Sequence, residues 1–217
     1  MKNILAFVLL FPFVIWSQSD YAKAEKIIEA GRYEQSRIIF EKFLKDKPSH
    51  LKTIEYLGDI AGHQKSWDKA IGYYQKLKKM KPSEANYYFK YGGVLGMKAK
   101  ESNKLKALGM IGEVKESFEK AIELNPKHIE ARWALIMVYI QLPSFVGGSE
   151  TKAIKYSNEL LKLSPVDGYL SRGQIDEHFK RYPAAEQQYK KAIAAGSTKT
   201  GGKLLDNLYK NKMKKAP

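Results

Sequence analysis

Residues 54–82 read IEYLGDIAGHQKSWDKAIGYYQKLKKMKP, and this stretch decides the fold. Its first half spaces Ile54, Leu57 and Ala61 three and four residues apart, which is typical of one face of a helix. A second run at helical spacing follows and stops at Pro82, which cannot continue a helix. The stretch therefore predicts two short helices joined by a turn.

The second helix of this unit belongs to a pattern that occurs five times. A small or apolar residue is followed by a residue at four, usually aromatic, an apolar residue at seven and usually a proline at twelve. The copies are Ser36-Phe40-Phe43-Pro48, Ala70-Tyr74-Leu77-Pro82, Val114-Phe118-Ala121-Pro126, Ala153-Ser157-Leu160-Pro165, and Ala185-Tyr189-Ala192, which ends at Ser197. Five copies indicate an array of stacked helical hairpins.

The unit around Gly58 resembles the tetratricopeptide repeat, whose 34 residues carry W-x2-L-G-x2-Y, then A-x3-F, then P. Tyr88-x2-Tyr91-Gly92 and Gly173 open further copies, whereas the fourth copy has Ile136 in place of the glycine. The resemblance implies an all-α, right-handed superhelical solenoid. We expect five hairpins, at about 18–50, 51–84, 85–128, 129–165 and 166–198, and a capping helix with a basic tail over 199–217.

Two spacings exceed one repeat and locate insertions. Between Pro82 and Pro126 the extra residues fall around 101–112, where a continuing helical period predicts a second helix lengthened at its start. Between Pro126 and Pro165 they fall at 143–148, which reads as a loop before a helix capped by Ser149. Since the two turns share an edge of a solenoid, we expect Phe145 and Val146 to pack on Leu105 and Leu108.

The first residues read as an export signal. Lys2 precedes an apolar run over 4–16, too short to span a bilayer, and Ser17 to Ser19 offers a cleavage site. We expect residues 1–17 to be removed and the chain to be periplasmic or secreted; an uncleaved anchor or a buried first helix are the alternatives. The chain has no cysteine, so disulfides and a lipidated cysteine are excluded.

The end of the chain gives a second helical stripe. Thr198 to Gly202 is expected to be a flexible break, and then Leu204, Leu205, Leu208 and Met213 recur at helical spacing. This is typical of the capping helix that repeat arrays need. The lysines at 210–215 make a polyanion-binding tail the alternative.

Motifs for chemistry are missing from the sequence. It contains no H-E-x-x-H, no G-x-S-x-G and no phosphate-binding loop, and its four histidines lack metal-ligand spacing. His50 and His128 follow the prolines and are expected to be loop residues. Gly92-Gly93-x2-Gly96 lies inside a helix, where close packing explains it. Gly147-Gly148-Ser149 is expected to be a turn and cap, with an anion held by its backbone N–H groups as the alternative. We therefore expect no enzyme activity, no cofactor and no metal.

The resemblance implies that the first helices line a concave groove. Glu55, Asp59, His63, Phe89, Met97, Trp133, Met137 and Ile140 are the candidate partner-binding residues. At the same register positions lie Tyr21, Glu25, Gly93, Leu170, Gln174 and His178. The lysines and asparagines with which some family members clamp a terminal carboxylate are absent there. The aromatic and methionine side chains suit apolar anchors, and core packing is the alternative for them.

We therefore expect an exported scaffold that binds a protein or peptide partner in this groove, without stable membrane insertion. The formal charge of +15 suggests a different class, a polyanion or anionic-surface binding protein of the cell envelope. Nucleic acid is the less favoured polyanion, because 33 of the 38 cations are lysine and only five are arginine, whose planar fork reads phosphates and base edges.

Overall fold

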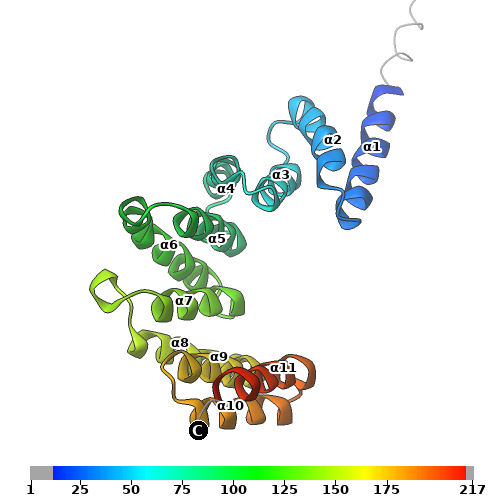
Figure 1. The fold of residues 1–217 in the computed structure, drawn as a ribbon. Coiled ribbons are helices and arrows are strands. Elements are labelled where there is room, and N and C mark those ends of the chain that lie inside the picture. The colour runs from blue at the N-terminus through cyan, green and yellow to red at the C-terminus, as the bar shows by residue number, and fades with distance from the viewer. Residues whose placement is uncertain (1–11, 214–217) are drawn as a thin grey trace, which may run out of the picture. The chain divides into compact units, whose positions relative to one another are not determined.

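The computed structural model of the protein describes residues 12–213, and these form helices and turns without a strand. Figure 1 shows the helices in chain order. They are α1 Pro12–Glu29, α2 Tyr33–Asp46, α3 Leu51–His63, α4 Trp67–Met80, α5 Ala85–Glu101, α6 Lys104–Leu124, α7 Ile129–Gln141, the 3-10 turn η1 Ser144–Val146, α8 Glu150–Leu163, α9 Pro165–His178, α10 Tyr182–Ala194, α11 Thr198–Leu208 and the π-turn η2 Tyr209–Met213. The all-α fold of five consecutive hairpins is confirmed.

The chain divides into two compact units, one ending at Pro82 and the other beginning at Ser83. Unit 1 contains the hairpins α1–α2 and α3–α4, and unit 2 contains α5–α6, α7–α8 and α9–α10 together with α11. In each unit consecutive helices pack on one another. The hydrophobic core is therefore a row of contacts between neighbours, as the repeat predicts.

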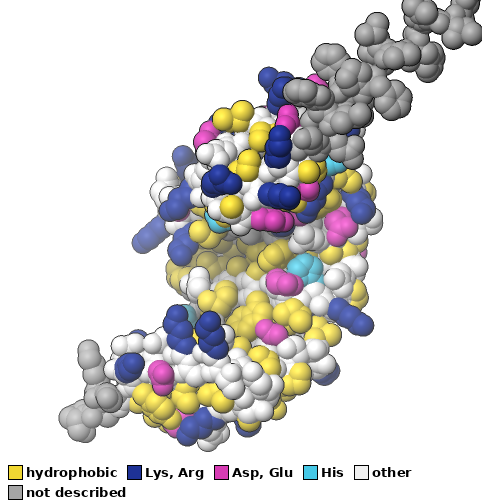
Figure 2. All heavy atoms as spheres, turned by 90° about the vertical axis from the view of Figure 1, so that its right-hand side faces the viewer, with side chains coloured by type: hydrophobic (Ala, Val, Ile, Leu, Met, Phe, Trp, Pro, Cys, Tyr) yellow, Lys and Arg dark blue, Asp and Glu magenta, His cyan; other side chains and the backbone are white. Residues whose placement is uncertain are grey.

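The surface of each unit mixes apolar and charged side chains. Figure 2 shows hydrophobic side chains at the surface, with lysine and arginine side chains scattered among them and fewer acidic ones between. On the face drawn there, the positive charge of the chain is thus spread out and does not gather in a single patch.

The helix crossings inside hairpins explain the repeated glycine. A Cβ atom on Gly58 would lie 2.8 Å from the Tyr74 ring, and one on Gly92 would lie 2.9 Å from the Phe118 ring. A Cβ atom on Gly173 would clash with the Tyr189 ring in the same way. The aromatic ring of each second helix thus occupies the space that a side chain on the first helix would need.

The short turns inside three hairpins use the same left-handed backbone. Gly31 has φ +73°, Lys65 φ +56° and Lys180 φ +60°. Glycine adopts this conformation without a steric penalty, whereas a lysine does so at a cost of roughly 1 kcal/mol. Two turns therefore keep a lysine at a position that favours glycine.

Histidines begin two of the first helices. His50 accepts a hydrogen bond from the Thr53 amide through Nδ1, and His128 accepts one from the Ala131 amide in the same way, both at 3.3 Å. An imidazole nitrogen here takes the place of the hydroxyl or carboxylate usual at a helix N-cap. The sequence predicts plain loop residues at both positions, and the structure shows that they cap helices.

The two insertions lie where the spacing predicts them. In the third hairpin α6 is 21 residues long, and in the fourth Ser149 caps α8 by accepting from the Lys152 amide at 3.2 Å. The expected packing of Phe145 on Leu105 is wrong, because these side chains are 87% and 82% exposed. A contact between Val146 and Leu108, which are both partly covered, stays a prediction.

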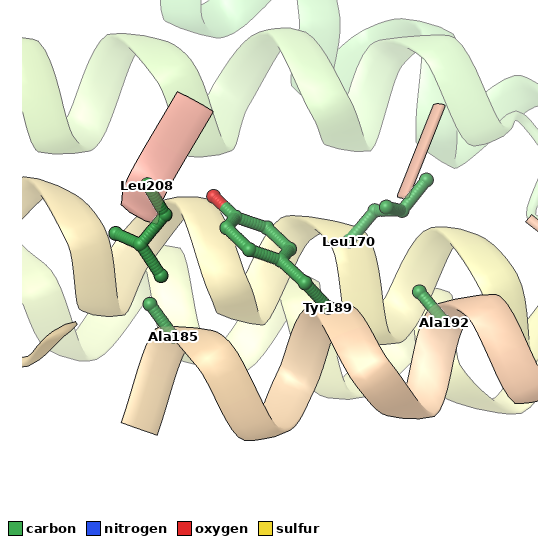
Figure 3. Packing of buried hydrophobic residues seen from close by; sticks show 5 residues of the cluster. All are labelled: Leu170, Ala185, Tyr189, Ala192 and Leu208. Atoms are coloured by element: carbon green, nitrogen blue, oxygen red, sulfur yellow. The ribbon is translucent and has the colours of Figure 1, made fainter. Parts of the chain in front are cut away.

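The C-terminal helix packs on the last hairpin (Figure 3). Leu208 is fully buried in one cluster with Ala185 and Tyr189. The expected flexible break is wrong, because α11 already begins at Thr198. Gly201 lets this first turn approach α10 closely, since a Cβ atom there would lie 2.9 Å from Ile193 Cγ1.

The expected export signal lies partly outside the described residues, which begin at Pro12. Residues 12–17 of the expected signal form the first part of α1, which begins at Pro12. Over residues 12–213, no helix combines the length and the apolar character that crossing a membrane requires.

Candidate functional site

A cavity of about 440 Å³ opens on the first-helix side of unit 2. Helix α7 lines it with Met137, Ile140 and Gln141, and α9 lines it with Gln174, Glu177 and His178. The spacing of three and four residues places each set on one face of its helix. Because the two sets occupy the same positions in neighbouring repeats, the stacking of the hairpins brings them together.

The remaining wall comes from segments that follow these helices. Lys180 and Tyr182 line it from the turn into α10, and Leu204 and Lys212 line it from the C-terminal helices. The cavity is thus apolar at Met137 and Ile140 and cationic at the two lysines. Its size falls in the range of about 300–1,000 Å³ usual for ligand pockets.

The acidic residue of the cavity is held by the core. Glu177 accepts a hydrogen bond of 2.7 Å from the Tyr189 hydroxyl. Burial, together with this hydrogen bond, raises the pKa of Tyr189, so the hydroxyl remains a donor. Glu177 therefore presents a carboxylate fixed in orientation, with part of its hydrogen-bonding capacity already used.

Two of the eight candidate residues line this cavity, namely Met137 and Ile140. Gln174 and His178, from the same register positions, join them. Met97 lies on α5 and is 41% exposed. Met97, Met137, Gln174 and His178 keep part of their side chains in solvent on first helices, as the groove interpretation requires, whereas Ile140 is only 5% exposed and belongs to the core.

Two candidate aromatic residues are engaged in packing. The Phe89 ring lies 5.9 Å from the Phe118 ring and 5.0 Å from that of His128, between centroids. Trp133 packs against the cluster around Leu170 and donates from Nε1 to Asp167 at 2.8 Å. Both are half-buried, so the structure assigns them mainly to the core between repeats.

The three candidates in unit 1 make contacts within the chain. Glu55 is paired with Lys52 at 3.5 Å, and Asp59 accepts a hydrogen bond from the Tyr74 hydroxyl. The His63 ring stacks on Tyr33 at 4.1 Å between centroids. All three groups thus have partners inside unit 1.

Unit 1 has a smaller cavity of about 210 Å³ between α2, α3 and α4. Its charged side chains pair with one another: Arg37 bonds to Glu34 and, at 2.6 Å, to Glu41. Hydrogen bonding from Arg37 lowers the pKa of Glu34. This internal network leaves the cavity in unit 2 as the better binding site.

The sequence does not predict the cavity residues that come from outside the first helices. Lys180 enters through the left-handed turn, and Leu204 and Lys212 enter because α11 packs on α10. The recurrence of a lysine two residues after His63 and again after His178 was a usable signal for the turn. Among residues 12–213, no group of three histidine or acidic side chains could hold a metal ion.

Comparisons with known proteins agree with this architecture. Models of the tetratricopeptide repeat match residues 21–85 and 105–128. No curated protein matches the chain.

Solved structures resemble it at low sequence identity and so inform the fold alone. A thermophilic tetratricopeptide-repeat protein of Thermus thermophilus has a TM-score of 0.70 at 16% identity, covering 88% of this chain and 98% of its own. PilF of Pseudomonas aeruginosa gives 0.65 at 18%, covering 89% and 83%. YrrB, described as having an unusual peptide-binding site, gives 0.58 at 16%, covering 91% and 98%. The two matched segments and the observed hairpins identify the chain as a tetratricopeptide-repeat protein, and the solved structures share its fold.

Proposed function

We propose that this chain is an exported scaffold that binds a peptide segment of a protein partner in the cavity between α7, α9 and the C-terminal helices. The observation that carries the proposal is the cavity itself, with an apolar floor at Met137 and Ile140 and lysines at its rim. An enzyme role is not favoured, because the tetratricopeptide repeat is typically a scaffold without catalysis. Export is supported by the apolar run near the N-terminus.

The chemistry of the lining indicates what the peptide carries. Met137 is flexible and polarizable, so it adapts to an apolar side chain of varying shape. Lys180 and Lys212 favour a carboxylate next to that anchor. Gln141 and Gln174 can donate to and accept from the peptide backbone. The expected ligand is therefore an extended segment with one apolar anchor and an adjacent acidic residue.

The lysine at the turn supports a binding role over a purely structural one. Lys65 and Lys180 occupy equivalent turns with the same left-handed backbone, but only Lys180 lines the cavity. Strained residues retained beside a cavity are often functional. The two lysines consequently form a matched pair for an experiment.

The test begins with capture of the partner. A photo-reactive amino acid at Gln174 is activated in an envelope extract, with the same group at Ile38 as the control position in unit 1. The cross-linked segment is identified by mass spectrometry and synthesised. Its affinity is then measured by calorimetry for the unchanged chain, for Met137→Ser, and for Lys180→Gly against Lys65→Gly.

We expect Met137→Ser and Lys180→Gly to weaken binding by about tenfold or more, as loss of a central contact does. Lys65→Gly should bind normally, although both glycine variants should gain thermal stability. Equal affinities for Lys180→Gly and Lys65→Gly, together with an unaffected Met137→Ser, would refute the cavity as the binding site.

A further inference from the structure

The first half of α6 carries apolar side chains that no other helix covers. Leu105 is 82% exposed and Leu108 is 47% exposed, and the first ten residues of α6 include no buried side chain. Its core contacts begin only at Val114. The inserted length of α6 therefore adds exposed apolar surface without adding core.

A second apolar projection comes from the neighbouring hairpin. Phe145, at the centre of η1, is 87% exposed. With Leu105 it is one of the two most exposed large hydrophobic side chains between residues 20 and 213. The insertions of two consecutive repeats thus share one unusual feature: each carries a large apolar side chain that is exposed to solvent.

The two projections lie on one edge of unit 2. The α5–α6 and α7–α8 turns lie on the same side of this unit in Figure 1. Lys115, two helical turns after Leu108 on the same side of α6, donates from Nζ to the Gly147 carbonyl at 3.4 Å. That bond ties the loop of Phe145 to α6.

Lysines lie beside these side chains along α6 and at the loop of Phe145. Residues 98–106 contain four lysines and one glutamate. Lys115 and Lys152 both lie over the Tyr139 ring, at 5.6 and 5.4 Å from its centroid. We define the tip patch as the three apolar side chains with their lysine rim. Its members are Leu105, Leu108, Phe145, Lys100, Lys104, Lys106, Lys115 and Lys152.

We infer that the tip patch docks the protein onto an anionic lipid surface. Apolar side chains that project from lysine-rich segments match both parts of such a surface, the acyl boundary and the charged headgroups. The three apolar side chains project from two separate segments, α6 and η1, so they can enter a partner but do not enclose one. A bilayer accepts projecting side chains without a preformed pocket.

Charge also favours an anionic lipid surface over a second copy of the chain as the partner of the tip patch. A two-fold contact through the tip patch would place its lysine rim against the same rim of the other copy, and like charges at close range oppose association. An anionic surface reverses that sign. The whole-chain charge of +15 acts in the same direction at longer range.

The absence of cysteine makes a site-specific test possible. Phe145→Cys is labelled with an environment-sensitive fluorophore, and Ile38→Cys, at a 60% exposed position in unit 1, is the matched control. Each is mixed with phosphatidylcholine vesicles with and without phosphatidylglycerol. We expect a blue shift at 145 only with the anionic vesicles, reversed at about 1 M salt, where the screening length falls to about 3 Å.

Sedimentation with the same vesicles tests which side chains are responsible. Since residues 4–16 could themselves enter a bilayer, every variant is compared with the unchanged chain carrying the same N-terminus. Leu105→Ser with Phe145→Ser should lower the partition coefficient at least about tenfold, because two exposed apolar side chains lose their burial. Lys203→Gln with Lys210→Gln, two exposed lysines of the C-terminal segment, should change it by less than about twofold.

Four results would overturn the inference. The first is an unshifted label at 145, and the second is normal vesicle binding by the double serine variant. The third is a larger loss from the C-terminal variant, which would place the lipid contact in the tail. The last is a label that responds to protein concentration, or to an acidic Glu-Leu peptide, but not to vesicles; the patch would then bind a second copy or a protein partner.

Discussion

Hairpins α3–α4 and α7–α8 fill the crossing between their two helices in opposite ways: the large side chain comes from the second helix in one and from the first helix in the other. In α3–α4 the first helix contributes Gly58 and the second contributes the Tyr74 ring, which is 1% exposed. In α7–α8 the equivalent positions hold Ile136 on the first helix and Ser157 on the second, and both are buried. The comparison teaches that the repeat keeps the crossing filled and leaves open which helix fills it.

The exchange also changes the hydrogen-bond partner of the hydroxyl group that the second helix places at the crossing. The Tyr74 hydroxyl reaches Asp59 on the first helix of its own hairpin. Ser157 is too short for that, and its hydroxyl instead joins Ser171 at 2.9 Å and the Gly168 carbonyl at 3.3 Å, both on α9. The fourth hairpin is thereby linked by buried hydrogen bonds to the fifth. A loss of aromatic volume is accompanied by a polar contact with the next repeat.

The largest effect is expected from emptying the crossing of α7–α8. Ile136→Gly removes a fully buried side chain and adds a helix-interior glycine, for a cost of roughly 3–6 kcal/mol. If the crossing can be filled from either helix, Ser157→Tyr should recover part of this loss in the double variant. Denaturant unfolding of both single variants and the double gives the coupling energy. A double variant less stable than Ile136→Gly alone would break the comparison.

A smaller effect is expected from overfilling the crossing of α3–α4. Gly58→Ala places a methyl group 2.8 Å from a ring that is buried and hydrogen bonded, so it should cost about 1–3 kcal/mol. Gly72→Ala in the same hairpin meets nothing within 4 Å and should stabilise α4 by up to about 1 kcal/mol. Thermal unfolding of the two variants provides the measurement. Unfolding temperatures that shift in the same direction for both variants would contradict close packing of Gly58 against Tyr74.

These two crossings show how far the sequence could predict the fold. The spacing of Gly58 and Tyr74 was sufficient for the hairpin, because close approach demands a small residue opposite a large one. The substitution by Ile136 and Ser157 read as a departure from the pattern, since volume compensation depends on which residues face one another in space. The cavity was predicted at Met137 and Ile140 but missed at Lys180, Leu204 and Lys212, because tertiary contacts alone bring those segments to α7.

The smallest effect concerns the histidine caps that begin both hairpins. Burial lowers the pKa of His128, so the unfolded chain takes up the proton first as the pH falls. Stability contributed by this cap is complete above the unfolded pKa of about 6.5 and decreases below it. His128→Asn, which keeps a cap without a titrating group, should remove about 0.5–1 kcal/mol of acid sensitivity between pH 7 and 5.

The measurement is urea unfolding at several pH values. His50→Asn makes the same substitution at the more exposed cap of hairpin α3–α4 and controls for the change of side chain itself. The prediction fails if His128→Asn leaves the pH dependence of the unfolding free energy unchanged, or if the unchanged chain becomes more stable as the pH falls.

The burial of Leu208 has a consequence for assembly. Helix α11 covers the side of α10 on which a sixth hairpin would stack, and Leu208 fills the gap against Ala185 (Figure 3). An open solenoid end is a template for head-to-tail polymerisation, because a heterologous contact that does not close continues into a filament. The buried Leu208 therefore blocks this stacking. Another copy could stack on the end of unit 2 only after displacing a fully buried side chain.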